Sequence, residues 1–220
     1  MPLPMVHLAV AHALKDEGFV GTDKAAYYLG ANAPDSIHKR EGWTRADKDQ
    51  SHLRSGLQPQ AGYEERIRRA RALMEHTGGD TAAGSFRAGY AVHLLTDVEW
   101  VRSFYHPCYL ARYRADPSPC QDVKAAYYND TDLADLHLYA VSPWRPEVFS
   151  LLRHARGQAL PGLVSAPEVE AWRDHILRFY AAMDRERYVA ARYILPQDID
   201  PFIARACRLI RAWLADMPLP

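Results

Sequence analysis

The sequence predicts a single all-α domain spanning residues 1–220, and two observations support this fold class. Apolar residues recur at helical spacing along most of the chain, and no alternating strand pattern of useful length interrupts them. Prolines separate most of the helical segments, as expected of connecting loops. A chain of 220 residues, 48% of them hydrophobic, is long enough to bury one sizeable core.

The predicted helices begin at the start of the chain. The first has apolar residues at helical spacing from Leu3 to Leu14 and ends near Gly18. The second begins with Thr22 as its N-cap and ends at Gly30. A loop-rich stretch then covers residues 31–62, and ordered loops of this length are more often functional than idle.

Helices resume after this stretch. A charged surface helix is expected over residues 62–76. The strongest helical pattern of the chain follows, from Asp80 as N-cap to about Phe104. Later helical segments are expected over residues 107–115, 120–140, 146–156, 167–187 and 198–216.

Charge and cysteine content narrow the function classes. Lys plus Arg and Asp plus Glu both number 27, so no global field attracts nucleic acid or an anionic membrane. No stretch reaches the ~20 apolar residues of a membrane-spanning helix, and the first residues lack the basic segment of a signal peptide. We therefore expect a cytoplasmic protein with three free thiols, at Cys108, Cys120 and Cys207. A Cys108–Cys120 bridge is the less favoured alternative.

His93 and Asp97 form the central motif of the strongest helix. They are one helical turn apart and lie on or beside its apolar stripe, which comprises Phe86, Tyr90, Leu94, Val98 and Val101. A carboxylate directed toward a core is costly unless it is paired or binds a metal. The motif therefore indicates either two metal ligands or a buried hydrogen bond between His93 and Asp97 that orients the helix.

Further potential ligands precede this motif. His7 lies on the apolar face of the first helix, where a hydrogen-bonded core histidine is the alternative to a ligand. Asp35 shares a face with His38 if Pro34 begins a helical turn, and His52 follows in the same loop-rich stretch. A His/Asp set without cysteine suits Zn²⁺, Mn²⁺ or Fe²⁺.

Four segments carry these residues: PMVHLA at 4–9, LGANAPDSIH at 29–38, SHL at 51–53 and GYAVHLLTD at 89–97. Their sequences and their order resemble the bacterial zinc-dependent phospholipase C family, chiefly its shorter members. The resemblance covers about the first half of the chain. The wider superfamily, which includes fungal single-strand nucleases, is all-helical and cleaves phosphodiesters with a cluster of zinc ions. The resemblance therefore implies a zinc-dependent phosphodiesterase.

The resemblance also implies roles for individual residues. Asp35, His52, His93 and Asp97 would surround one metal ion, and Asp97 would bridge to a second ion held by His7. His38 matches a histidine of the shorter relatives and is included among the metal ligands. Three ligand sources of the secreted enzymes have no counterpart here: a processed N-terminal tryptophan, a histidine soon after the His-x-x-x-Asp pair, and a later His-x-x-x-Glu pair. We therefore expect a centre of one or two ions, with Asp35 as the catalytic residue that takes a proton from the attacking water.

Other residues complete the expected site. Lys39 and Arg40, next to His38, are placed to meet a substrate phosphate. Asp132 and Asp135 could complete a metal shell or line the mouth of the site, with a solvated helix face as the more common alternative. The predicted function is hydrolysis of a small-molecule phosphoester, most simply a phosphodiester. Two alternatives stay open: a metal-dependent hydrolase of another bond, such as an amide, and a non-catalytic helical module with a structural ion or a buried His–Asp network.

Overall fold

The computed structural model describes residues 3–57, 63–75, 81–113, 115, 123–183 and 188–215. Most of these residues are helical and none lies in a strand, which confirms the all-α fold class. The α-helices are α1 (Pro4–Ala13), α2 (Lys24–Gly30), α3 (Arg45–Ser51), α4 (Tyr63–Glu75), α5 (Ala82–Trp100), α6 (Val123–Val141), α7 (Arg145–His154), α8 (Ala166–Phe179) and α9 (Ile199–Leu214). Shorter helical elements are η1 (Gly18–Val20), η2 (Ala33–Lys39), η4 (Tyr180–Ala182) and η6 (Pro196–Asp198), and η3 (Val101–Tyr113) continues α5 as a π-helix.

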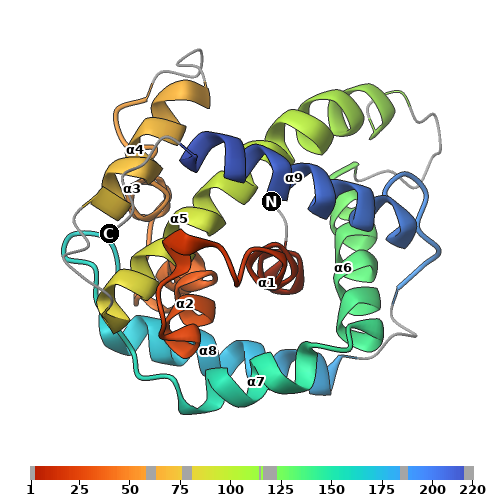
Figure 1. Ribbon diagram of the computed structural model, residues 1–220. Coiled ribbons are helices and arrows are strands. Elements are labelled where there is room, and N and C mark those ends of the chain that lie inside the picture. Colours follow the sequence, from red (N-terminus) through yellow and green to blue (C-terminus); the bar gives the residue numbers. More distant parts are fainter. Residues whose placement is uncertain are drawn as a thin grey trace.

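Helix α1 runs through the middle of the molecule, and the other long helices surround it (Figure 1). It packs against α2, α5, α6 and α9. Every residue from Pro4 to Ala11 is buried, as expected of a helix that is apolar on all sides. His7 is therefore enclosed by protein rather than placed at the surface.

Helices α2 and α5 approach each other closely at two glycines. A Cβ atom added at Gly89 would lie 2.0 Å from the carbonyl oxygen of Tyr27, and one added at Gly30 would lie 2.1 Å from that of Phe86. Only a residue without a side chain fits at either position. This close approach places the backbone of Ala31 beside the middle of α5.

The stretch at 31–62, predicted to be loop-rich, contains more regular structure than expected. Element η2 has Pro34 in its first turn, so the conditional prediction of a helical turn there is confirmed. Helix α3 begins with a capping box: Asp47 N donates to Thr44 Oγ1 at 3.3 Å, and Thr44 N donates to Asp47 Oδ2 at 2.8 Å. These reciprocal bonds satisfy the first backbone donors of a helix that the apolar pattern does not reveal.

Two other helix boundaries differ from the prediction. Asp23, not Thr22, caps α2 by accepting a hydrogen bond from Ala26 N at 2.9 Å. Thr81 caps α5 through Gly84 N, whereas the predicted cap, Asp80, lies outside the described residues. The helical path continues from α5 into η3 without the break expected between residues 104 and 107.

Two further expectations concern cysteine pairing and membrane insertion. Cys207 is a free, buried thiol. The alternative Cys108–Cys120 bridge lies outside the described side chains. Within the described ranges, no helix combines the length and the apolar character needed to cross a membrane.

Candidate metal centre

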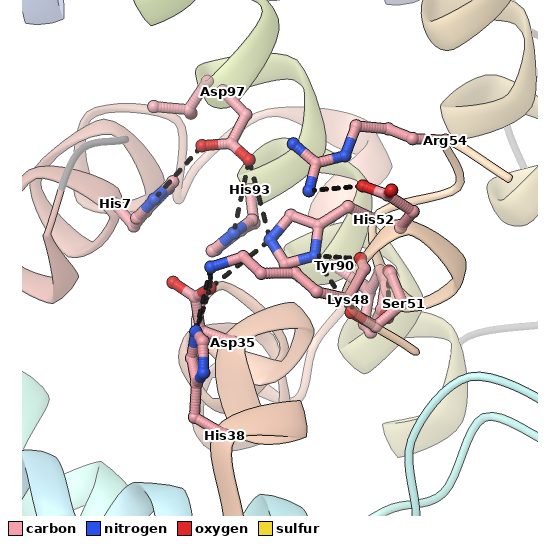
Figure 2. Close-up of polar contacts among 12 residues, drawn as sticks. His7, Asp35, His38, Lys48, Ser51, His52, Arg54, Tyr90, His93 and Asp97 are labelled. Carbon is pink, nitrogen blue, oxygen red and sulfur yellow. Dashed lines mark hydrogen bonds and ion pairs between the residues drawn. The ribbon is translucent and has the colours of Figure 1, made fainter. Parts of the chain in front are cut away.

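Four elements bring five of the predicted ligands together (Figure 2). Helix α1 supplies His7, the first turn of η2 supplies Asp35, the C-cap of α3 is His52, and α5 supplies His93 and Asp97. Asp35 is 8% exposed and the other four side chains are at most 2% exposed. Residues far apart in the sequence thus form one buried cluster.

Two overlapping groups within this cluster can hold a metal ion. One consists of His7, His93 and Asp97, and the other of Asp35, His52 and His93. In each group, one potential ligand atom of every residue lies within 4.8 Å of the others. The two groups share His93, so the cluster is continuous.

Asp97 lies among three imidazoles. Its Oδ1 is 3.8 Å from His7 Nε2, and its Oδ2 is 3.7 Å from His52 Nε2 and 3.9 Å from His93 Nε2. These separations exceed the ~3.2 Å limit of a good N–H···O hydrogen bond. Two ligands that are each ~2.1 Å from a tetrahedral ion lie ~3.4 Å apart. The geometry therefore resembles ligands around an ion more than the buried His93–Asp97 hydrogen bond that the sequence left open.

Backbone carbonyl groups orient two of the imidazoles. His93 Nδ1 lies 2.9 Å from the carbonyl oxygen of Ala31, and His52 Nδ1 lies 3.0 Å from that of Lys48. An Nδ1–H that donates to a carbonyl leaves Nε2 with its lone pair available. Metal-binding histidines are commonly held in this way, so both rings present Nε2 to the cluster.

Several polar atoms of the cluster lack hydrogen-bond partners despite complete burial. They are both ring nitrogens of His7, Nε2 of His52, Nε2 of His93, and both carboxylate oxygens of Asp97. Leaving a buried polar group unsatisfied costs about 1–3 kcal/mol, and more for a charged group. A divalent cation would satisfy these atoms together, so the residues present fit a metal ion.

The protonation states also suit a cation. Burial, together with the neighbouring His93, lowers the pKa of His7, and burial lowers the pKa of His52. Burial alone would raise the pKa of Asp97, but the surrounding histidines outweigh it and keep that pKa below its ordinary value. Neutral imidazoles and an ionised carboxylate are the forms that bind metals.

The backbone is strained immediately after His52. Leu53 has a φ of 52°, in the left-handed region that costs a non-glycine residue about 1–2 kcal/mol. Tyr90 supports the preceding residue, because its hydroxyl donates to the carbonyl oxygen of Ser51 at 2.6 Å. Such strain persists only where surrounding contacts maintain it, and here it fixes the end of α3 that carries a predicted ligand.

Lys48 is a residue of the site that sequence reasoning missed. Its Nζ lies 3.3 Å from Asp35 Oδ1 and 2.9 Å from His38 Nε2. His38, also predicted as a ligand, is 3.8 Å from Asp35 Oδ1 but belongs to neither metal-ligating group. The spacing of Lys48 one turn before His52 on a polar helix was the available signal. Without a prediction of α3, this spacing could not be interpreted.

Arg40 and Lys39 do not join the cluster. The Arg40 guanidinium forms ion pairs with Asp47 at 2.9 Å and Glu168 at 2.7 Å, which tie η2 to α3 and α8. Lys39 Nζ lies 5.4 Å from the centre of the Trp172 ring on α8. Both side chains thus contact α8, and Arg40 also contacts α3.

Asp135 and Asp132 also occupy other places. Asp135 is buried beside the N-terminus of α1, where it accepts hydrogen bonds from Val6 N at 3.0 Å and Met5 N at 3.3 Å. Asp132 is half-buried, and burial raises its pKa to about 6. Neither carboxylate belongs to the two metal-ligating groups of the described chain.

Searches against protein-family models, curated proteins and solved structures found no match to this chain. The evidence for the fold and for the buried cluster is therefore the geometry of this molecule itself. Membership of the phospholipase C family stays a prediction from the four sequence segments.

Proposed function

We propose that this protein is a metal-dependent hydrolase of phosphoesters, with zinc as the first candidate metal. The observation that carries the proposal is the set of buried, unpartnered ligand atoms around Asp97. Five side chains from four elements converge there, and the lowered pKa values of His7 and Asp97 favour a neutral imidazole and an ionised carboxylate, which suit a cation. A cluster of this kind is expensive to maintain unless something binds to it.

The proposed metal ligands are His7, Asp35, His52, His93 and Asp97, which suit one or two ions. Asp97 belongs to the first group, and its Oδ2 also faces His52 of the second group, which supports a bridging role for this carboxylate. When bound, a divalent ion supplies a Lewis acid for phosphoryl oxygens and lowers the pKa of water in its coordination shell. Zn²⁺, Mn²⁺ and Fe²⁺ all accept this mixed nitrogen and oxygen donor set.

Asp35 and Lys48 are the residues proposed to act on the substrate side of the centre. Burial raises the pKa of Asp35, but His52 and Lys48 outweigh that effect and hold the pKa well below its ordinary value. Asp35 is thus an ionised carboxylate that can accept a hydrogen bond from an attacking water and orient it. Lys48 Nζ, 3.3 Å from Asp35 Oδ1, supplies a positive charge for a phosphoryl oxygen.

The test combines metal content with hydrolysis. The chain is purified without chelator, its metals are measured by mass spectrometry, and its turnover of bis(p-nitrophenyl) phosphate is recorded. We expect one to two equivalents of a transition metal and measurable turnover, with both reduced about tenfold or more in Asp97→Asn.

His12→Asn is the matched control. His12 lies on α1, like His7, but its Nδ1 contacts the Tyr28 hydroxyl at 3.0 Å, outside the cluster. Metal content and turnover should be unchanged in this variant. Turnover of a p-nitroanilide amide without any phosphoester activity would overturn the proposal in favour of another hydrolase. Bound metal without hydrolysis of either substrate would indicate a structural ion.

A further inference from the structure

A cationic cavity of about 780 Å³ lies beside the candidate metal centre. Its basic lining residues come from α3, α4 and α6 and from the segment after α3, and they are Arg45, Lys48, Arg54, Arg66 and Lys124. Asp and Glu are absent from its lining among the described residues. A chain with a formal net charge of zero thus concentrates positive charge at one place.

The cavity is continuous with the centre through two residues. His38 and Lys48 line the cavity and also lie 3.8 Å and 3.3 Å from Asp35 Oδ1. Arg54 also lines the cavity and lies next to His52 (Figure 2). A molecule in the cavity would therefore contact His38 and Lys48, the two side chains that separate it from Asp35.

The positive charges are only partly neutralised by the protein. Arg45 and Arg54 share one carboxylate, Asp49, at 3.3 Å and 3.1 Å. Arg54 Nε is buried without a hydrogen-bond partner. No carboxylate of the described chain lies within ion-pair distance of the half-buried Arg66, and burial lowers the pKa of its guanidinium. A half-buried cation without a counter-charge is costly, so an anion beside Arg66 would relieve this arrangement.

Aromatic side chains gather at the mouth of the same cavity. Trp43, Tyr105 and Tyr128 are 40%, 37% and 47% exposed, and they are the large aromatic residues that the described part of the chain leaves exposed. All three line the cavity. Exposed aromatic faces can pack against a flat organic group or against a quaternary ammonium group.

Charge decides between these two kinds of ligand. A quaternary ammonium group would have to lie among guanidinium and ammonium groups, where like charges repel it. An organic anion would be attracted by the cations of the lining while its carbon skeleton packs against the aromatic rings. The cavity therefore favours an organic polyanion over a zwitterionic headgroup.

We propose that the cavity binds a small organic phosphate that carries a second anionic group. The phosphoester of this ligand would be presented to the metal centre, and the second anionic group would lie in the cavity. This inference rests on the proposed function, because hydrolysis of the phosphoester would take place at the metal centre. The cations of the lining would hold the second anionic group, and the mouth aromatics would hold the organic skeleton. Substrates with two negatively charged groups would be selected over singly charged or zwitterionic ones.

Binding measurements test this proposal without requiring hydrolysis. Isothermal titration calorimetry of the full chain compares fructose 1,6-bisphosphate, fructose 6-phosphate and phosphocholine. We expect the bisphosphate to bind about tenfold more tightly than the monophosphate, equivalent to one added charge contact of about 1.4 kcal/mol. Phosphocholine should bind most weakly, and the bisphosphate affinity should fall with rising salt.

Single substitutions distinguish binding in the cavity from binding elsewhere on the surface. Arg66→Gln should remove most of the preference for the bisphosphate, and the exposed Arg45→Gln should reduce it without endangering the fold. Arg68→Gln is the matched control, because Arg68 lies on the same helix but pairs with Glu65 away from the cavity. Circular dichroism and metal content confirm that each variant keeps its fold and centre.

The outcomes distinguish this inference from the proposed function. Bisphosphate binding that depends on Arg66, in a protein that hydrolyses no phosphoester, would support the cavity and refute the hydrolase. Hydrolysis of bis(p-nitrophenyl) phosphate with equal affinity for all three ligands would support the hydrolase and refute the cavity. Tighter binding of phosphocholine, no binding of any ligand, or an equal loss in Arg68→Gln would also overturn the inference.

Discussion

The carboxylate of Asp97 contacts different neighbours through its two oxygens. Oδ1 faces His7 from α1, whereas Oδ2 faces His52 and His93. A carboxylate in a fully buried position that makes no hydrogen bond needs a positive charge nearby. Because burial lowers the pKa of both His7 and His52 and so favours their neutral forms, a bound cation is the simplest source of that charge.

The position of His38 allows the ligand set to be tested residue by residue. His52 belongs to a metal-ligating group, whereas His38 contacts Lys48 Nζ at 2.9 Å and lies at the edge of the cluster. We expect His52→Ala to lower metal affinity about 10–100-fold or more, and His38→Ala to change it less than about threefold. Metal titration followed by equilibrium dialysis measures both values. A comparable loss of metal in His38→Ala would place this residue among the ligands.

At the scale of single elements, the close approach of α2 and α5 controls the orientation of His93. Replacing Gly89 by Ala in an unconstrained helix would stabilise it by about 1 kcal/mol. Here the added Cβ meets Tyr27 O at 2.0 Å, so we expect Gly89→Ala to destabilise the protein by about 2 kcal/mol. Denaturant unfolding measures the change.

The same substitution should also affect the metal centre. The added Cβ would lie 2.8 Å from Ala31 N, and the Ala31 carbonyl oxygen holds His93 Nδ1 at 2.9 Å. Separating α2 from α5 would loosen this bond and lower metal affinity. An unchanged or increased stability of Gly89→Ala would contradict the close approach described here.

Asp135 links α6 to the start of α1 and gives this contact a pH dependence. Burial raises its pKa to about 7, so the folded state keeps a proton on this carboxyl over a pH range in which the unfolded chain has lost it. Stability from this group is therefore present at low pH and declines as the pH rises from about 4 through 7.

The comparison with Asp135→Asn isolates this effect. The stability of the wild type relative to the variant should decline with pH by up to about 1.4 kcal/mol per pH unit within that window. Denaturant unfolding at several pH values between 5 and 8 gives the difference. A difference that grows with pH would mean that the folded state favours the ionised carboxylate.

Three ligands of the candidate site could be predicted from the sequence because they lie on helices with a clear apolar pattern. His93 and Asp97 lie one turn apart on an apolar helix, and His7 lies on another, so their burial was predictable from periodicity. Helix α3 could not be predicted from periodicity, because only one of its residues, Ser51, is buried. A capping box rather than an apolar stripe marks this helix. Without α3, neither Lys48 nor the cationic cavity could be placed.

At the scale of the whole molecule, the residues that line the cavity could not be predicted from helical periodicity. Arg66 lies on the helix that the sequence predicts to be a charged surface helix, yet the packing of α4 against α5 places it beside α3 in the cavity lining. Tyr128 comes from α6, where the sequence indicated Asp132 and Asp135 as candidate site residues. Their convergence depends on how distant helices pack, and such contacts leave no trace in local spacing.

Because the ligands come from α1, η2, α3 and α5, a bound ion would connect the first residues of the domain to its central helix. Binding to the folded state alone stabilises it by about 2.7 kcal/mol when the free ligand is at a hundred times its dissociation constant. For a domain of this size, that corresponds to a shift in melting temperature of about 5–10 °C. We therefore expect chelation to lower the melting temperature by this amount and re-addition of zinc to restore it, as measured by calorimetry. Asp97→Asn should show little response to either treatment, whereas His12→Asn should respond like the wild type. A wild-type melting temperature that is indifferent to chelator and zinc would mean that the buried cluster contributes to stability without an ion.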